Sequence, residues 1–387
     1  MNSKDRKGFI SLREMSISIL HIDMSKGWRE GESQLLPLGR ALQKRGHNLW
    51  IGAPPKSGLL LKSTELRLKT IPIRGVRLFT LLEAKRIGKT VEKKGISILH
   101  LHGLNSLRFG LGVKQRTRDA VIVIISLQEV SPSFKKGRRL KEGRGVEQIV
   151  VSSKVVQKRL ESMGITSERL SLIRSGVDLI RFSPAVKPYD LFEEYCFPPE
   201  TTIIGYVAPS LCDKGERILI EAAREVVSIN SEIIFLMAGE GRDSRKSLEA
   251  MIEQYGLSQN FIFCGFPDKL PAILAALDLF VLPAVEGDPG LTTLKAMATA
   301  VPVITTNLSG VKEIIKDGVN GVVVPPGDSH ALARVIMEFI EDRQRWKIMG
   351  QEGRRVAEVK FDINKSARKI EKLYQQLLKK RGHHGDA

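Results

Sequence analysis

The sequence is poor in cysteine and in long apolar stretches. Its three cysteines, Cys196, Cys212 and Cys264, are scattered and odd in number, which excludes a disulfide framework or a cysteine metal knuckle and fits a reducing cytoplasm. No apolar run approaches the ~18 to 20 residues that a membrane span needs. Residues 1–14 lack the apolar core of a signal peptide, so we expect a loose leader or a mis-called start there.

Acidic residues are scarce in the first half of the chain. Residues 1–183 carry 36 Lys and Arg against 15 Asp and Glu, a net charge of +21, whereas the remaining 204 residues carry 25 against 28, a net of −3. A basic half attracts phosphates on a membrane, a lipid or a nucleic acid. Few aromatic residues stand among these charges and no recognition motif is found, so nucleic-acid binding is not expected. The alternative is that the basic charge of residues 1–183 is an ordinary solvated surface with no ligand.

Apolar strands alternate with helical patterns along both halves. In the first half, "SISILHID", "NLWIGAP", "ISILHLHG", "DAVIVIIS" and "VEQIVVSS" are predicted strands, and "ESQLLPLGRALQKRGH" is a predicted helix. The pattern pauses near Pro184 and Pro188 and then restarts with "TTIIGYVA". Alternation of this kind predicts an α/β fold with parallel sheets covered on both faces.

Two Rossmann-like, doubly wound domains are therefore expected to face a cleft. We place the first domain at residues 15–183, the second at 184–360, and a crossing helix with its tail at 361–387. The last amphipathic helix is expected to return to the first domain. Ligands in such folds bind beyond the carboxyl ends of the strands.

The segment "VEGDPGLTTLKAMATA" has the layout of a phosphate-binding helix start. It follows a predicted strand, contains Gly287 and Gly290, and enters a helix through Thr292 and Thr293, both able to cap it. Free N–H groups and the positive dipole end of that helix suit a diphosphate. Glu286, just before, can accept hydrogen bonds from sugar hydroxyls. A plain strand–loop–helix turn explains the same residues.

Other polar residues follow predicted strands. Lys214 is placed to reach a phosphate, although a lone lysine there is more often solvated. Backbone near Gly265 can read a nucleobase beside Phe266, whose ring is by default part of the core. Gly27 and Gly31 can let a loop approach a ligand from the first domain.

His100 and His102 share one face of a predicted strand. His102, at the carboxyl end of this strand, is the candidate for a polar role in the site, and His100 is the candidate for a histidine buried in the core. No carboxylate or cysteine accompanies them, so we expect no metal.

Taken together, these segments resemble the family-4 (group 1) glycosyltransferases of the GT-B fold. The resemblance covers most of residues 15–380 and rests on an ordered series that includes "GRALQKRGH", "ILHLHG", "SGVDLIRFSP", "KGERILIEAA", "AGEG" and "FCGFPDKLPAILAALDLFVLPAVEG". It implies a retaining, metal-independent hexosyltransferase that uses a nucleoside-diphosphate sugar as substrate and needs no cofactor. The second domain would hold the donor, and the first a glycan or lipid-linked acceptor.

Carried over by position, the resemblance gives roles to individual residues. Glu286 would contact the donor sugar, His102 would lie near its anomeric carbon, and Lys214 would bind phosphate. The backbone of Gly290, Leu291 and Thr292 would contact the diphosphate, and the loop from Gly27 to Gly31 would lie beside both substrates.

Three positions depart from the family pattern. The second acid, expected eight residues after Glu286 and bonded to the ribose, is replaced by Lys295 at nine residues. Pro209 stands where an arginine often precedes the phosphate lysine, and Glu30–Gly31 replaces a glycine pair. Because an ammonium offers only hydrogen-bond donors, we hypothesise that Lys295 supplies the positive charge that Pro209 lacks. An exposed lysine that never touches ligand is the alternative.

The leading interpretation is a cytoplasmic glycosyltransferase of surface polysaccharide or lipopolysaccharide synthesis, peripheral on the inner face of the plasma membrane. The alternative is a nucleotide-sugar-binding or scaffold protein of the same fold with weakened catalysis. An epimerase needs acid–base carboxylates that the sequence does not place.

Overall fold

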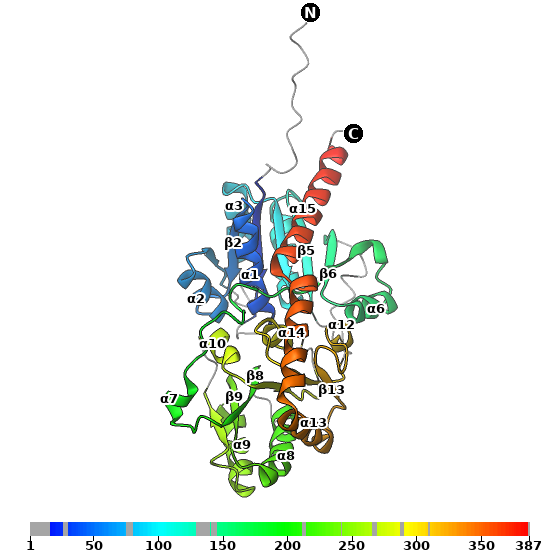
Figure 1. Cartoon of the computed structure of the whole chain (residues 1–387). Coiled ribbons are helices and arrows are strands. Elements are labelled where there is room, and N and C mark those ends of the chain that lie inside the picture. The colour runs from blue at the N-terminus through cyan, green and yellow to red at the C-terminus, as the bar shows by residue number, and fades with distance from the viewer. Residues whose placement is uncertain are drawn as a thin grey trace, which may run out of the picture.

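Two α/β units lie one above the other in the computed structural model of the chain (Figure 1). The structure describes residues 16–25, 30–74, 80–128, 140, 145–210, 214–240, 242–264, 269–286, 290–308 and 310–385. No helix within these residues is long and apolar enough to cross a membrane.

The first unit is built on a parallel sheet of seven strands in the order β3-β2-β1-β4-β5-β6-β7. The strands are β1 (Ser18–Asp23), β2 (Asn48–Ala53), β3 (Lys69–Pro72), β4 (Ile98–His102), β5 (Ile122–Leu127), β6 (Gln148–Val151) and β7 (Leu170–Leu172). Their central members, β1, β4 and β5, are buried along nearly their whole length, as strands covered on both faces must be.

Helices cover both faces of this sheet. They are α1 (Glu30–Lys44), α2 (Gly58–Glu65), α3 (Thr80–Lys93), α4 (Leu107–Arg116) and α6 (Lys154–Ser162). Side chains of α3, α4 and α6 join one buried cluster, and those of α1 and α2 join another on the opposite face. The start of α6 is fixed by Ser153, whose hydroxyl accepts a hydrogen bond from the Val156 amide at 3.2 Å.

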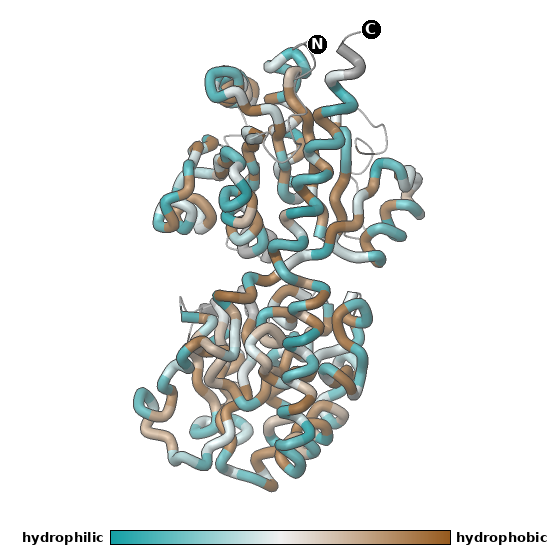
Figure 2. The backbone as a smooth tube through the Cα atoms, turned by 45° about the horizontal axis from the view of Figure 1, so that its top comes forward, coloured by the Kyte–Doolittle hydropathy of each residue, from teal (hydrophilic) through white to brown (hydrophobic). Residues whose placement is uncertain are grey.

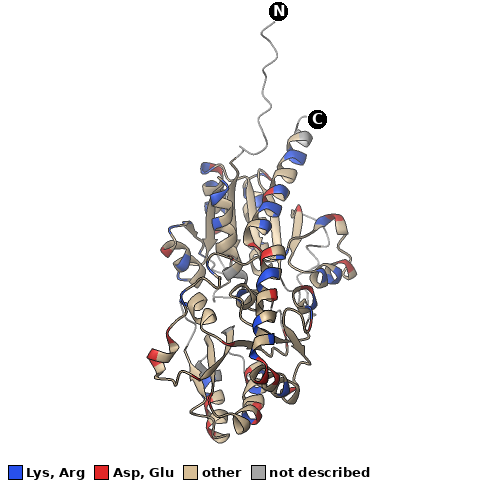
Figure 3. Ribbon diagram, viewed as in Figure 1, with Lys and Arg blue, Asp and Glu red and all other residues tan. Residues whose placement is uncertain are grey.

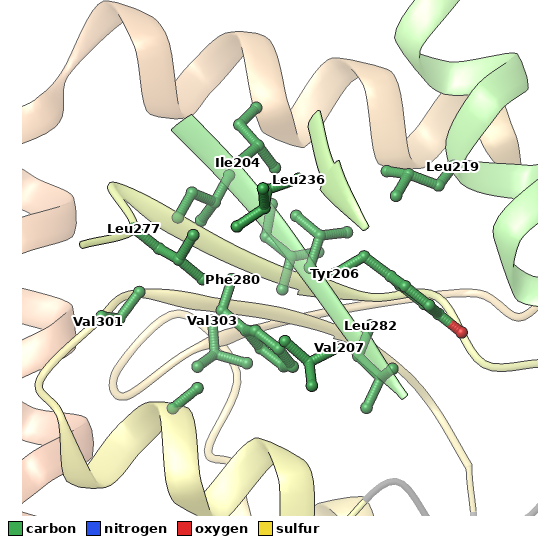
Figure 4. Close-up of a cluster of buried hydrophobic side chains, with 14 of the residues drawn as sticks. Ile204, Tyr206, Val207, Leu219, Leu236, Leu277, Phe280, Leu282, Val301 and Val303 are labelled. Carbon is green, nitrogen blue, oxygen red and sulfur yellow. The ribbon is translucent and has the colours of Figure 1, made fainter. Parts of the chain in front are cut away.

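The second unit contains a parallel sheet of six strands in the order β10-β9-β8-β11-β12-β13. The strands are β8 (Thr202–Ser210), β9 (Ile233–Glu240), β10 (Phe261–Phe263), β11 (Leu279–Leu282), β12 (Val303–Thr306) and β13 (Val322–Val324). Figure 4 shows Ile204, Leu236, Phe280 and Val303 from four adjacent strands packing together in its core.

The remaining helices surround this second sheet and then cross back. They are α7 (Leu191–Tyr195), α8 (Lys214–Ile229), α9 (Arg242–Gln254), α10 (Leu270–Ala275), α11 (Gly290–Ala298), α12 (Val311–Ile314), α13 (Ser329–Glu341), α14 (Arg343–Lys360) and α15 (Ile363–Gly385). The prediction of two doubly wound α/β units is thus confirmed.

The chain crosses between the units twice, and the two crossings pair at a narrow waist (Figure 2). The Val177 amide donates to the Phe361 carbonyl at 2.7 Å, and the Ile363 amide donates to the Val177 carbonyl at 3.0 Å. Gly176 permits this approach, because a Cβ there would lie 2.6 Å from the Cα of Ile363.

Helix α15 returns to the first unit and packs against α1, as the sequence predicted. Ile363, Ala367, Ile370, Leu373 and Tyr374 complete the buried cluster on the α1 face. Many Lys and Arg lie along the rest of this helix (Figure 3).

Candidate active site

Each sheet has one point where the strand order reverses, and ligands bind at such points in open α/β sheets. In the first sheet this point lies between β1 and β4, and in the second between β8 and β11. The predicted residues follow or end these same strands: His102 ends β4, Lys214 follows β8, and Glu286 follows β11.

The two units touch through the segments that follow the carboxyl ends of their strands. One carboxylate oxygen of Glu313 in α12 accepts from the Lys154 amide at the start of α6 at 2.7 Å. The other accepts from the Arg174 guanidinium at 2.8 Å. Because Lys154 follows β6 and Glu313 follows β12, the carboxyl ends of both sheets are directed toward each other.

Lys214 and Glu286 meet at the switch point of the second sheet. The Lys214 ammonium lies 2.9 Å from a Glu286 carboxylate oxygen, and the two side chains are 54% and 69% exposed. Lys214 is the first residue of α8. The predicted strand "TTIIGYVA" ends at Ala208. Strand β8 instead continues to Ser210 with a register shift between Val207 and Ser210. Pro209 lies within this irregularity, where a missing amide donor is tolerated.

Helix α11 begins at Gly290, directly beyond Glu286 and a short segment outside the described residues. Thr292 and Thr293 therefore lie inside its first turn and do not cap it, which corrects the prediction of capping threonines. Both are buried, as is Leu291, and no described residue partners the Thr293 hydroxyl. Gly290 to Thr292 thus lie in the first turn, where backbone N–H groups lack partners within the helix.

Lys295 lies one turn further along α11 and is 8% exposed. The alternative of an exposed surface lysine is therefore wrong. Its ammonium is 5.9 Å from the ring centroid of Phe182, a buried residue of the first crossing. The positive charge that replaces the family's acid thus lies against the waist of the molecule.

On the first sheet, three histidines form a stack on the face covered by α15. His21 of β1 is the register partner of His100 in β4, and His102 follows two residues later. The ring centroids of His100 and His102 are 4.6 Å apart, and those of His21 and His102 are 5.1 Å apart. His21 Nδ1 and His102 Nε2 share a hydrogen bond of 2.8 Å.

The third ring of the stack, His100, is bonded on both sides. Its Nδ1 lies 2.5 Å from the Tyr374 hydroxyl of α15, and its Nε2 lies 2.7 Å from the Ser126 hydroxyl of β5. His100 is thus a hydrogen-bonded core histidine, the role that the sequence analysis preferred for it.

All three imidazoles are held neutral by burial. Desolvation lowers the pKa of His102 to about 3. Desolvation, reinforced by the neighbouring histidines, lowers the pKa of His21 and of His100 well below 6.5. The site therefore presents an uncharged histidine at neutral pH.

The three histidines have the composition of a metal site, and their nearest nitrogens lie within 4.8 Å of one another. The planes of the His21 and His102 rings differ by 24°, however, and those of His100 and His102 by 23°. The His21 and His102 nitrogens nearest each other are already joined by a hydrogen bond, and both nitrogens of His100 already have partners. The group fits a hydrogen-bonded stack better than a metal centre.

Several predicted residues lie outside the described part of the chain: Gly27, Gly265, Phe266 and Gly287. Gly31 is among the described residues and lies in the first turn of α1. The prediction that it belongs to a loop is therefore wrong.

Sequence reasoning missed three partners of the histidine pair: His21, Ser126 and Tyr374. His21 had a usable signal, because β1 and β4 are neighbours in a doubly wound sheet. The Tyr374 contact spans 274 residues, and no local pattern predicts it.

The fold and the residues at its two switch points define a two-domain α/β protein of the GT-B type. The family described as Glycosyl transferases group 1 matches residues 190–356, and the one described as Glycosyltransferase Family 4 matches residues 31–181. The chain belongs to the group 1 glycosyltransferases.

Individual relatives agree with this assignment. The chain is 32% identical over 190 residues to WcaL of Salmonella typhimurium, a protein named for colanic acid biosynthesis, with 47% of this chain and 44% of WcaL covered. It is 25% identical over 241 residues to the lipopolysaccharide core biosynthesis mannosyltransferase LpsB of Rhizobium meliloti, covering 59% and 69%. The chain spans about half the length of most curated relatives that it matches.

Among solved structures, Anabaena HepE in complex with UDP-glucose superposes with a TM-score of 0.81 at 20% identity, over 93% of this chain and 100% of HepE. At this identity the likeness concerns the fold.

Proposed function

We propose that this protein transfers a sugar from a nucleoside-diphosphate sugar to a glycan or lipid-linked acceptor in the synthesis of surface polysaccharide or lipopolysaccharide. The observation that carries the proposal is the meeting of Lys214 and Glu286 at the β8/β11 switch point, beside the start of α11. One group suits a phosphate and the other suits sugar hydroxyls. The names of WcaL and LpsB and the UDP-glucose in HepE support this class of reaction.

The proposed reaction retains configuration and uses neither a metal nor another cofactor. The bond between the anomeric carbon and the diphosphate oxygen breaks, and the acceptor oxygen bonds to that carbon. The acceptor's proton passes to an oxygen of the departing diphosphate. Lys214 and the first turn of α11 stabilise the negative charge that develops on the diphosphate, while Glu286 and His102 hold the sugar.

A donor screen tests the proposal. Purified protein is incubated with several nucleotide sugars and a crude lipid acceptor, and products are read by mass spectrometry. We expect Glu286→Gln to lower turnover about 10²-fold and Lys214→Met to weaken diphosphate binding about tenfold, each by removing one charged contact. Glu352→Gln is the matched control, because Glu352 pairs with Arg355 at 2.8 Å on the surface of α14. Tight diphosphate binding without turnover of any donor would instead identify a binding or scaffold protein.

We also propose that Lys295 adds positive charge near the diphosphate. Lys295→Glu is then expected to weaken binding of uridine or guanosine diphosphate about tenfold, measured by isothermal titration. Because Lys295 also contacts Phe182, Lys295→Met, which keeps the apolar stem, controls for packing. A rise in turnover in Lys295→Glu would refute the compensation idea.

The first unit is proposed to face an anionic membrane surface from the cytoplasm. Leu81 and Leu82 of α3 are 65% and 64% exposed, and the same helix carries Lys85, Lys89 and Lys93. Exposed apolar groups beside cationic ones suit an anionic lipid surface. Co-sedimentation with phosphatidylserine vesicles is expected, and it should be lost with phosphatidylcholine vesicles and weakened in the variant Leu81→Ser/Leu82→Ser.

A further inference from the structure

The contact between His21 and His102 contains a single hydrogen whose position is not arbitrary. His21 Nδ1 and His102 Nε2 are 2.8 Å apart, and both rings are neutral in the folded protein. A neutral imidazole has one N–H and one bare nitrogen. One of these two rings therefore donates, and the choice fixes the tautomer of both.

The second nitrogen of His21 decides between the two arrangements. His21 Nε2 is fully buried, and no described residue lies within hydrogen-bonding distance of it. If His102 were the donor, His21 would carry its own proton on Nε2, as a buried N–H without an acceptor. If His21 donates through Nδ1, its Nε2 is a bare lone pair. Orphaned buried N–H groups are the rarer and costlier defect.

His100 places no competing demand on this pair. Its two nitrogens are bonded to the hydroxyls of Tyr374 and Ser126, and a hydroxyl can donate or accept. The ring of His100 stacks on His102 at 4.6 Å and so limits tilting of the His102 plane.

We propose that His21 is a positioning residue, which donates to His102 Nε2 and thereby fixes His102 in the Nδ1–H tautomer. This inference rests on the proposed function in giving His102 a place at the reacting sugar. His102 then offers the site a hydrogen-bond donor and no basic nitrogen. The acceptor's proton must accordingly leave by another route, which agrees with its transfer to the departing diphosphate.

The tautomer can be read directly in the ligand-free protein. Long-range 1H–15N correlation spectra of protein labelled with 15N-histidine distinguish a protonated ring nitrogen from a bare one. Variants that each replace one histidine assign the signals of the seven histidines. We expect protonated Nδ1 and bare Nε2 for both His21 and His102. A protonated Nε2 on His102 overturns the proposal.

Two substitutions of His21 test its positioning role. The side-chain amide of asparagine lies the same number of bonds from Cα as His Nδ1, so His21→Asn can still donate, and His102 should keep its Nδ1–H tautomer. His21→Leu cannot donate, and we expect a mixture of His102 tautomers with kcat lowered about tenfold at unchanged KM. His100→Asn is the control, with the His102 tautomer unchanged.

The outcomes separate this inference from the proposed function. A His102 tautomer that is the same in His21→Leu as in the wild type refutes the role of His21, whatever the turnover. Should His21→Leu fail to fold, the wild-type and His21→Asn spectra still decide. The absence of turnover with every donor refutes the proposed function, while the tautomer assignment stands on the spectra.

Discussion

The histidine stack predicts an unusual sensitivity of this fold to mild acid. His21, His100 and His102 are neutral in the folded protein because burial lowers their pKa values, whereas each regains an ordinary pKa near 6.5 when the chain unfolds. At pH values between a histidine's folded and unfolded pKa, the unfolded state binds a proton that the folded state does not bind. Stability is therefore undiminished above about pH 6.5 and falls as the pH drops below it.

The magnitude follows from the size of the shift. Each pH unit between the unfolded and folded pKa values is worth about 1.4 kcal/mol for one histidine, so at about pH 5 His102, whose folded pKa is about 3, has lost about 2 kcal/mol. His21 and His100 add losses of the same sign, and a loss of about 2 kcal/mol is already a substantial part of the free energy of unfolding of a typical domain, ~5 to 15 kcal/mol. His102, with its pKa of about 3, continues to lose stability well below pH 5.

Urea denaturation followed by circular dichroism, at a series of pH values between about 7.5 and 5, measures this loss. His21→Leu removes one of the three buried imidazoles and should make the pH slope shallower. His330→Gln is the control, because the His330 side chain is 83% exposed. A stability that is flat from pH 6.5 to 5, or a slope that His21→Leu leaves unchanged, would refute the reasoning.

Three further changes act at the waist and between the units. Glu313→Ala removes both carboxylate contacts to the first unit. We expect the arrangement in which the two units touch to lose about 1 kcal/mol, a roughly fivefold shift in its population that energy transfer between labelled units can measure. An unchanged distribution of transfer efficiencies would contradict this. Arg354 donates to the carbonyls of Phe182 and Ala298 at 2.8 and 2.5 Å, so Arg354→Ala should lower the free energy of unfolding by about 2 kcal/mol, with partial recovery in Arg354→Lys. Gly176→Ala would place a methyl group against the backbone of Ile363, and calorimetry should show about 1 to 3 kcal/mol of destabilisation; an unaltered melting temperature would show that the waist can yield.

Much of the fold could be read from local sequence because its signals are local. Apolar runs such as "DAVIVIIS" and "TTIIGYVA" are long enough to specify buried strands, and β5 and β8 lie where they predict. Strand β3 was missed because only four residues form it and its burial is partial. Helix α3 lies in a strongly basic stretch whose apolar spacing is less evident, although Ala84, Ile87 and Val91 do recur on one buried face.

The site was predictable only in outline. Glu286 and Lys214 were found separately, since each follows a strand, but their contact depends on β8 and β11 being neighbours. The threonines of α11 were misread as caps because the helix begins two residues before Thr292. The environment of Lys295 could not be inferred locally, because Phe182 approaches it from a segment more than a hundred residues earlier.

The return of α15 to the first unit has a consequence for how the protein is made. The first seven strands are complete by Leu172, yet one face of their sheet is covered in part by Ala367, Ile370 and Tyr374. A ribosome must therefore synthesise the whole second unit before the first can finish its core, because the tyrosine that bonds His100 follows that unit in the chain. During synthesis the second unit can close before the first, so the usual amino-to-carboxyl order of domain folding is inverted. Until then the nascent sheet exposes an apolar face, which is a natural substrate for chaperones.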